Sequence, residues 1–337
     1  MDVRLSPEQQ ALRDSVALVV DRLGPKAVGQ LDDAERAGKL GAAVASSGWL
    51  ELRGAEHGGA PLASGVEAAI VAEELGRGLA DTPFLGPTLA AELRRLTGAP
   101  DATAAETVLF AAGLGEPATS VEGAVAIDAR GASSALLLVP ADGGGGSVLA
   151  EVALEPVDGP TDLTRPTAVP SGVPAPVAGQ DRPLTDDALT SWTVLGLALT
   201  CADLVGVMRG AVELSTEYAT ARRQYGTAIG SFQAVQHLLA DAFVAMEGSR
   251  SVALHAAWAV DARSPGEALA AGAVAKAYCA RAARSVCETA IQVHGGIGNT
   301  WECLAHVFLR RALLSSDVLG GAGANLARVL ALHGIER

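Results

Sequence analysis

Residues 221–226, with the sequence ARRQYG, place two arginines and a tyrosine immediately before a glycine, at the end of a very long apolar run. A guanidinium group presents a fixed fork of hydrogen-bond donors that suits phosphate and carboxylate groups. The chain as a whole is acidic, with a net charge of −13. The cluster therefore indicates a negatively charged ligand. The alternative is a solvated helix end, where arginines complement the helix dipole.

Length and composition limit the class of protein. The 337 residues, 49% of them hydrophobic, suit two or three domains with a sizeable core. The acidic balance argues against nucleic acid or an anionic membrane surface as the main partner. We find no export signal and no uninterrupted apolar stretch of about 18 residues, which predicts a cytoplasmic chain without a membrane span. The four cysteines form no CxxC pair and are expected to be reduced, mostly buried thiols rather than metal ligands.

The first region, residues 1–103, predicts a helical domain. Its opening stretch, LSPEQQALRDSV, has the residues of a capping box with proline at the first helical position: Ser6, Pro7 and Gln9. VEAAIVAEELGRGLA predicts a second helix that stops at Gly76 or Gly78. Between them, GWLELRGAEHGGAPL is rich in glycine and is expected to be irregular.

The other two regions complete a mostly α fold with a small β domain in the middle. Residues 104–184 contain nine of the 16 prolines and two short apolar runs, ALLLVPAD and SVLAEVALEPV, which predict strands. Residues 185–337 contain three long helical patterns joined by short loops, which predicts a helical bundle.

The long bundle helices carry their own boundary signals. Caps are expected at Thr185, Ser231 and Ser264. The first helix is expected to run for about 40 residues, to Tyr225. The third is expected to end at Gly295 and Gly296. Two shorter helices are expected around 300–315 and 321–334.

The order of these regions and several motifs resemble the acyl-CoA dehydrogenase flavoenzymes. The similar stretches of the first region are LSPEQQALRDSV, GWLELRGAEHGGAPL and AAIVAEELGRGLADTPFLG. Those of the bundle are ARRQYGTAIGSFQAVQHLLADAF and AIQVHGGIGNTWE. The likeness covers nearly the whole chain and is weakest in the middle. It implies the three-part fold of that family, FAD as the cofactor and α,β-desaturation of an acyl-CoA thioester as the reaction.

The resemblance assigns the ADP half of FAD to the bundle. Arg222 would donate to the pyrophosphate, and Gln224, Tyr225 and Gln233 match family positions that line the same half. In the family these bundle residues reach across a dimer interface to the neighbouring subunit's FAD. If this property carries over, Arg222 serves the cofactor of a partner.

A second family motif follows the third long helix. Gln292 offers both a donor and an acceptor, and Gly295 and Gly296 leave the backbone bare where a nucleotide could lie close. The alternative is a simple C-cap, because a glycine after a helix commonly has that role. His294 is expected to pack or cap rather than to catalyse.

The chain departs from the family where the catalytic base is expected. The base is usually a glutamate between the last two helices, and the aligned positions here are Leu319, Gly320 and Gly321. Other members carry it early in the first long bundle helix, which corresponds to Gly196. None of these residues can accept a proton, so the sequence assigns no catalytic residue. The alternative is a relocated base at Asp203 or Asp317, although a structural or surface carboxylate is commoner.

The middle region also lacks parts of the flavin-binding wall. The stretch GLGEPATSVEG keeps Glu116 and Pro117 of a Thr-Glu-Pro motif, but Gly115 replaces the threonine and no Gly-Ser follows. The Trp-Ile-Thr position falls in AVAIDARG, which has no tryptophan. A flavin ring needs a flat apolar wall and donors aimed at its polar atoms, and we find neither.

This combination resembles the short chain of actinobacterial two-chain acyl-CoA dehydrogenases, including those that shorten steroid side chains. The resemblance implies a longer acyl-CoA dehydrogenase partner in an α2β2 heterotetramer, with electron-transfer flavoprotein as a possible acceptor. Two alternatives stay open. One is a self-sufficient homo-oligomer with a relocated base, and the other is a non-enzymatic scaffold of the same fold.

Overall fold

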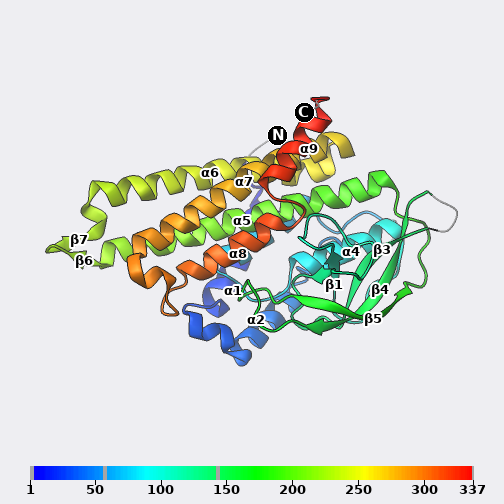
Figure 1. The fold of residues 1–337 in the computed structure, drawn as a ribbon, viewed down its shortest axis with the longest axis horizontal. Coiled ribbons are helices and arrows are strands. Elements are labelled where there is room, and N and C mark those ends of the chain that lie inside the picture. Colours follow the sequence, from blue (N-terminus) through cyan, green and yellow to red (C-terminus); the bar gives the residue numbers. More distant parts are fainter. Residues whose placement is uncertain (1–3, 56–58, 142–144, 336–337) are drawn as a thin grey trace.

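The computed structural model describes residues 4–55, 59–141 and 145–335. Long helices form a bundle that extends across the whole molecule, a small β barrel lies against one end of it, and the N-terminal helices pack along one side (Figure 1). This arrangement confirms the predicted mostly α fold with a small β domain in the middle of the chain.

The N-terminal part consists of α1 (Pro7–Leu23), η1 (Val28–Asp32), α2 (Ala34–Ser46), α3 (Gly65–Arg77) and α4 (Leu85–Thr97). The predicted capping box of α1 is present, with the Ser6 hydroxyl accepting from the Gln9 N–H at 3.2 Å. α3 continues through Gly76 and is capped by Gly78. Gly76 has a packing role, because a Cβ there would lie 2.6 Å from the Asp203 carbonyl oxygen. The described parts of the glycine-rich stretch at 48–62 are irregular, as expected; residues 56–58 lie outside the described chain.

Two N-terminal helices were not predicted. α2 does have a local signal, because Asp33 accepts from the Arg36 N–H. α4 has no side-chain cap of its own. Its first turn is capped from the barrel by Asp128, whose Oδ2 accepts from the N–H groups of Phe84 at 3.3 Å and Gly86 at 3.1 Å. Such a cap is invisible in the local sequence.

The middle part is a closed barrel of β1 (Glu106–Phe110), β2 (Val125–Ala126), β3 (Ser134–Pro140), β4 (Ser147–Pro156) and β5 (Ala168–Pro176). The strand order is β1-β2-β5-β4-β3, with β1 and β3 parallel and the other pairs antiparallel. The two predicted apolar runs form β3 and β4, confirming those predictions. Leu137 pairs with Ala150 between them, and both side chains lie in the barrel core.

The bundle consists of α5 (Asp186–Ala221), α6 (Gln233–Ala262), α7 (Pro265–His294), α8 (Ala305–Asp317) and α9 (Ala322–Leu332). Thr185 caps α5, as predicted. The helix has 36 residues and ends before Arg222, so the expected extension to Tyr225 is wrong. The predicted cap at Ser231 is also wrong. Ser231 lies in η2 (Ile229–Ser231), and Phe232 occupies the N-cap of α6 without a side-chain hydrogen bond.

The first long bundle helix, α5, is the centre of the bundle. By length and composition it is the one helix among the described residues that could cross a membrane. However, 89% of its most apolar window is buried inside the protein, which is typical of a core helix. All four cysteines are free and buried, as the sequence predicted.

A buried charge cluster joins the three parts of the fold around Asp203 of α5. Asp203 Oδ1 accepts from Arg311 Nε at 3.0 Å and Nη2 at 2.6 Å, and its Oδ2 accepts from Ser315 Oγ at 2.5 Å. Arg311, on α8, also donates to the carbonyl of Ala80 in the N-terminal part and to Thr164 Oγ1 in the barrel part.

Arg165 completes this cluster from the barrel side. It pairs with Asp203 at 3.5 Å and with Asp162 at 3.0 Å, and it donates to Ser315. Burial alone would raise the pKa of Asp203, but the Arg165 and Arg311 guanidiniums outweigh this effect and lower the pKa below its usual range. Asp203 is therefore held as a buried carboxylate that needs both arginines.

We predict that Asp203→Asn lowers the free energy of unfolding by about 3–5 kcal/mol, because it leaves the buried guanidinium of Arg311 without its counter-charge and removes one of the carboxylates that Arg165 pairs with. The folded-state pKa is lowered, so the carboxylate stabilises the fold above the unfolded pKa near 4, and this contribution is lost as the pH falls further. Chemical denaturation from pH 7 to pH 3 should therefore show the difference from wild type narrowing below about pH 4.

Asp187→Asn provides the matched control, because Asp187 is exposed in the first turn of the same helix. Asp187→Asn should lower the free energy of unfolding by less than about 1 kcal/mol. Normal stability of Asp203→Asn, combined with loss of turnover, would contradict the structural role and favour a catalytic one.

Candidate functional site

The predicted anion-binding residues lie at the far end of the bundle, away from the barrel (Figure 1). Arg222 is the C-cap of α5, and its N–H donates to the Tyr218 carbonyl at 2.8 Å. The next residues form a two-stranded hairpin of β6 (Arg223–Gln224) and β7 (Thr227–Ala228). Tyr225 occupies the turn with φ +54° and a side chain that is 95% exposed.

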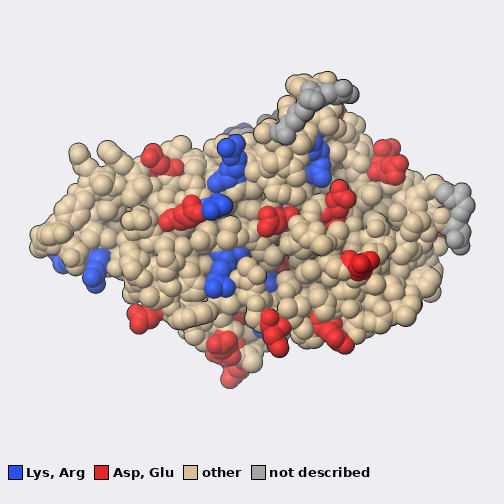
Figure 2. Space-filling view, viewed as in Figure 1, with Lys and Arg blue, Asp and Glu red and all other residues tan. Residues whose placement is uncertain are grey.

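Arg222 and Arg223 are exposed, and no ion pair or side-chain hydrogen bond involves either of them within the described parts of the chain. This distinguishes them from Arg53, Arg94 and Arg311, which are buried against carboxylates. Basic side chains are visible at the hairpin end of the molecule (Figure 2). The N–H donors of Arg222 and Arg223 are therefore available to a ligand.

The structure brings the other predicted residues to the same end. Gln233 is the exposed first residue of α6, and Phe232 before it meets the Tyr225 ring edge-on at 6.3 Å. The end of α7 lies beside the end of α5, because His294 stacks on Tyr218 with ring centroids 4.4 Å apart. His294 is buried, and its Nδ1 lies 2.7 Å from the Ala290 carbonyl, which confirms a packing role.

Gln292, Gly295 and Gly296 are exposed at this end of α7. Gly295 is the C-cap, with φ +63°, a conformation that favours glycine. A Cβ at either glycine would meet nothing within 4 Å, so the backbone there faces open space. Unpaired guanidiniums, exposed amides and a bare backbone fit the polar ADP half of a dinucleotide. They do not provide the apolar wall that a flavin ring needs.

A cleft of about 400 Å³ lies at the opposite end of α5, between the barrel and the bundle. Its lining residues from the barrel side include Gly115, Glu116 and Pro117, and α5 contributes Asp186, Leu189, Thr190 and Thr193. Leu319 and Arg328 complete it from the loop after α8 and from α9. Sequence reasoning did not assign Asp186 and Arg328 to this cleft, because nothing local links them to the Glu116 segment.

Two of the positions that align with the family's base, Leu319 and Gly196, are in contact with each other here. Leu319 is 1% exposed, and a Cβ at Gly196 would come within 2.3 Å of Leu319 Cδ1. The Leu319 N–H donates to the Leu114 carbonyl at 2.8 Å, which ties the loop directly to the barrel. An apolar contact therefore occupies both of these positions.

Two side chains hold the loop that carries Leu319 by donating hydrogen bonds to its backbone carbonyls. Asn325 Nδ2 donates to the Gly320 carbonyl at 2.7 Å, and Lys276 Nζ donates to the Val318 carbonyl at 2.8 Å and to the Ser315 carbonyl at 2.5 Å. Complete burial lowers the pKa of Lys276 to about 8, because desolvation disfavours the ammonium form. These donors hold the loop in the conformation that the structure shows.

Neither alternative base lies in this cleft. Asp203 is buried and fully engaged with Arg311, Ser315 and Arg165. Asp317 is exposed and does not line the cleft. The carboxylates that do line it are Glu116 and Asp186, both exposed. Within the described ranges, no group of three or more His, Cys, Asp or Glu side chains could hold a metal ion.

Comparison with known proteins agrees with this architecture. The acyl-CoA dehydrogenase N-terminal domain matches residues 6–96, and the acyl-CoA dehydrogenase C-terminal domain matches residues 195–331. The chain is 32% identical over 330 residues to acyl-CoA dehydrogenase IpdE2 of Mycobacterium tuberculosis, covering 93% of both chains. It is 38% identical over 224 residues to acyl-CoA dehydrogenase FadE34 of the same organism, covering 64% of this chain but only 30% of that longer protein.

Solved structures show the same fold. One chain of the ChsE4-ChsE5 complex of Mycobacterium tuberculosis superposes with a TM-score of 0.80 at 24% identity, covering 100% of this chain and 100% of that one. A glutaryl-coenzyme A dehydrogenase in complex with glutaryl-CoA gives a TM-score of 0.76 at 18% identity, covering 100% of this chain and 98% of that one. The two domain matches and the relative that is 32% identical over 93% of both chains show that the chain belongs to the acyl-CoA dehydrogenase family, whose members are FAD-dependent oxidoreductases.

Proposed function

We propose that this chain is the catalytically incomplete subunit of a two-chain acyl-CoA dehydrogenase. In this proposal, Arg222, Gln224, Tyr225, Gln233 and the Gln292–Gly296 segment bind the ADP half of FAD held by a longer, homologous partner. The partner supplies the flavin wall and the base, in an α2β2 complex. We also propose that the chain is located in the cytoplasm.

One observation carries the proposal. The residues that would bind ADP and this chain's own cleft lie at opposite ends of α5. Thr193 in the cleft and Arg222 are 29 positions apart, which is roughly 44 Å along a helix. A single FAD cannot span that separation, so the ADP-binding end serves the cofactor of another chain.

The contact between Leu319 and Gly196 beside the cleft supports the second half of the proposal. Leu319 and Gly196 cannot take a proton, and their contact leaves no space for a carboxylate between them. When bound, FAD supplies the hydride acceptor for the desaturation. The contribution of this chain is then to orient the cofactor through Arg222 and the exposed amides, and to complete the wall of the partner's site.

An exposed apolar surface on the bundle supports association with another chain. Phe243 and Val244 of α6 are 51% and 68% exposed, and Val274 and Tyr278 of α7 are 45% and 46% exposed. A groove of about 590 Å³ between α6, α7 and α9 includes Val274, Tyr278 and Leu326. Apolar patches of this kind mark interaction sites.

The substrate is proposed from the relatives. The ChsE4-ChsE5 structure is a two-chain complex, and Tcur3481-Tcur3483, with a TM-score of 0.78 at 22% identity, is described as a steroid acyl-CoA dehydrogenase. We propose that the substrate of the complex is a bulky acyl-CoA thioester, such as a steroid side-chain ester, and that the partner binds most of it. Electron-transfer flavoprotein is the proposed electron acceptor.

The chain produced alone should contain little flavin and show no acyl-CoA dehydrogenation. Co-expression with a longer acyl-CoA dehydrogenase chain encoded beside it should give a yellow complex with fewer FAD molecules than chains. Flavin absorbance, mass photometry and reduction of an artificial acceptor by steroid side-chain CoA esters would measure these properties. One FAD per chain and full turnover without a partner would instead establish the self-sufficient enzyme.

Arg222→Ala should raise the dissociation constant of FAD in the complex by about 10- to 100-fold, because it removes charge-assisted hydrogen bonds worth about 1.5–3 kcal/mol. Arg222→Lys should restore part of the affinity. Arg284→Ala is the matched control, because Arg284 is 67% exposed and, among the residues that the structure describes, pairs only with Glu288 on its own helix. Unchanged flavin affinity in Arg222→Ala would favour the scaffold alternative.

Leu319→Ala should lower the free energy of unfolding by about 2–4 kcal/mol, as expected for a buried leucine, while kcat of the complex stays unchanged below the unfolding temperature. The control is Leu332→Ala, because Leu332 is 43% exposed. This change should lower the free energy of unfolding by less than about 0.5 kcal/mol. A fall in kcat without a fall in stability would place the Leu319 loop in the catalytic machinery.

A further inference from the structure

The arginine hairpin and the cleft beside the barrel lie at opposite ends of α7 as well as of α5. Leu269, near the start of α7, lines the cleft, and Gln292, near its end, lies at the hairpin end of the bundle. These two residues are 23 positions apart, which is roughly 35 Å along a helix. We propose that two copies of this chain, when no other partner is present, pack antiparallel along α7, and that each copy places its arginine hairpin against the cleft of the other.

The surface between the two ends is apolar. Val274, Tyr278 and Leu326 line the groove between α6, α7 and α9, and each of them is 45–46% exposed. Arg281 is the one charged residue among the described lining residues; it is exposed and can keep its guanidinium in water while its stem packs. α9 connects this groove to the cleft, because Arg328, two positions after Leu326, lines the cleft. An exposed apolar groove of this kind suits a second protein surface.

The groove lies at the place where a two-fold axis would be needed. Tyr278 is close to the midpoint of α7 between Leu269 and Gln292. An axis there brings the Leu269 end of one copy beside the Gln292 end of the other. Figure 1 shows the corresponding order of elements, with β6 and β7 at one end of the molecule, the barrel at the other and α9 beside α7 between them.

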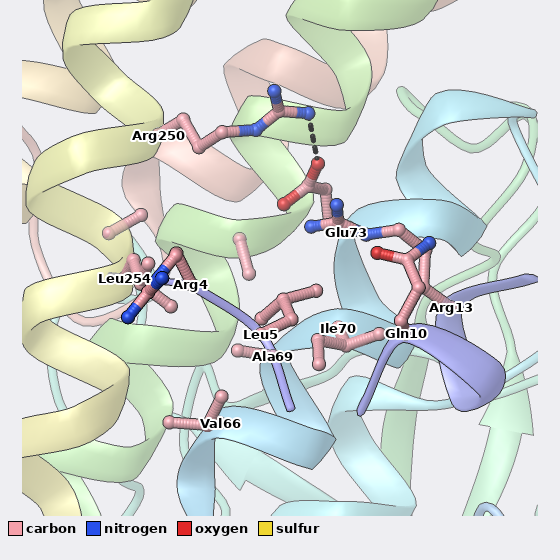
Figure 3. Close-up of a pocket in the computed structure, with 12 residues that line it drawn as sticks. Arg4, Leu5, Gln10, Arg13, Val66, Ala69, Ile70, Glu73, Arg250 and Leu254 are labelled. Carbon is pink, nitrogen blue, oxygen red and sulfur yellow. Dashed lines mark hydrogen bonds and ion pairs between the residues drawn. The ribbon is translucent and has the colours of Figure 1, made fainter. Parts of the chain in front are cut away.

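The hairpin carries charge that its own chain does not neutralise. Arg222 and Arg223 are exposed and have no acidic partner among the described residues. Arg250 of α6 shows the contrast, because it donates to Glu73 of α3 at 2.7 Å beside the cavity that these two helices line (Figure 3). The two hairpin guanidiniums can therefore bind an anionic group on another molecule.

The cleft offers such groups. Glu116 lines it from the barrel side and Asp186 from the first turn of α5, and both are exposed. Neither carboxylate has an ion pair within 4 Å or a side-chain hydrogen bond to another described residue. Arg328 is attracted to Glu116, but its Nη1 donates to Asn325 Oδ1 at 2.6 Å. The lining thus presents two carboxylates against one guanidinium, and carboxylates accept charge-assisted hydrogen bonds from arginine.

The two ends of the chain are therefore complementary in charge, and the groove between them is apolar. In a two-fold dimer the hairpin–cleft contact occurs twice, so the assembly closes without leaving either end free. This inference does not rest on the proposed function. The proposed complex with a longer chain uses the same hairpin, so the two associations exclude each other.

Sedimentation equilibrium of the purified chain, without partner or added FAD, tests the proposal. It should show a monomer–dimer equilibrium whose dissociation constant rises at least about tenfold between about 50 mM and 500 mM NaCl, because salt screens the hairpin–cleft pairs. The dimer should show no flavin absorbance, because carboxylates and not a cofactor meet the arginines. A chain that stays monomeric up to about 100 µM, or a dimer that forms only with bound flavin, would overturn the proposal.

Charge reversal identifies the contact. One variant combines Arg222→Glu with Arg223→Glu, and the other combines Glu116→Arg with Asp186→Arg. Each alone should self-associate at least about tenfold more weakly, because like charges then meet at both contacts. An equimolar mixture should dimerise about as tightly as wild type, because the reversed hairpin meets the reversed cleft and the native hairpin meets the native cleft. Undiminished self-association of either variant, or a mixture that stays monomeric, would refute the hairpin–cleft contact.

Tyr278→Ala tests the groove. It should weaken dimerisation about tenfold while the salt dependence remains, because it removes apolar contact and no charge. Leu18→Ala and Arg22→Glu are the matched controls, because both residues are exposed on α1, which lines neither the groove nor the cleft, and they should dimerise as wild type does. Control-like dimerisation of Tyr278→Ala would contradict packing across the groove.

These measurements need neither flavin nor partner. Failure of the proposed two-chain enzyme would therefore leave them unaffected, and a monomeric chain would not argue against that enzyme.

Discussion

The carboxylate of Asp203 is the point on which the three parts of this fold converge. It lies on the central helix α5 and is buried, so it requires the guanidiniums of both Arg311 and Arg165. Arg311 extends the cluster to the Ala80 carbonyl and to Thr164, and Arg165 extends it to Asp162. The N-terminal helices, the barrel and α8 are thereby fixed relative to one helix. The same engagement removes Asp203 from consideration as a free base.

The length of α5 determines how far apart the arginine hairpin and the cleft beside the barrel lie. One straight element presents the arginine hairpin at one end and lines the cleft beside the barrel at the other (Figure 1). Its 36 residues separate the two ends by more than one cofactor can bridge. Under the proposed function, such a chain contributes to two different sites in an assembly. At the hairpin end, the guanidinium groups of Arg222 and Arg223 are exposed to a ligand. At the cleft end, Leu319 packs directly against Gly196.

Much of this architecture was predictable from the sequence because its signals are local. Capping residues placed the starts of α1, α5 and α7, and apolar runs placed β3 and β4. Predictions failed where a distant contact replaced the local signal, and where a tight hairpin ended a helix inside a stretch of helical composition. Asp128 caps α4 from the barrel, and the hairpin at Tyr225 ends α5 earlier than its composition suggested. A backbone hydrogen bond satisfied from elsewhere in the chain leaves no mark in the neighbouring residues.

The sequence by itself determined the family, the mostly α fold, the residue types of the predicted anion-binding site and the absence of a carboxylate at Leu319 and Gly196. Only the tertiary structure decided that those two residues touch, that Arg222 and Arg223 have no acidic partner among the described residues, and that Asp203 has several. The reason is physical. Residue type fixes what a side chain can donate, accept or bury, whereas its protonation and availability depend on neighbours that only folding brings within a few ångströms.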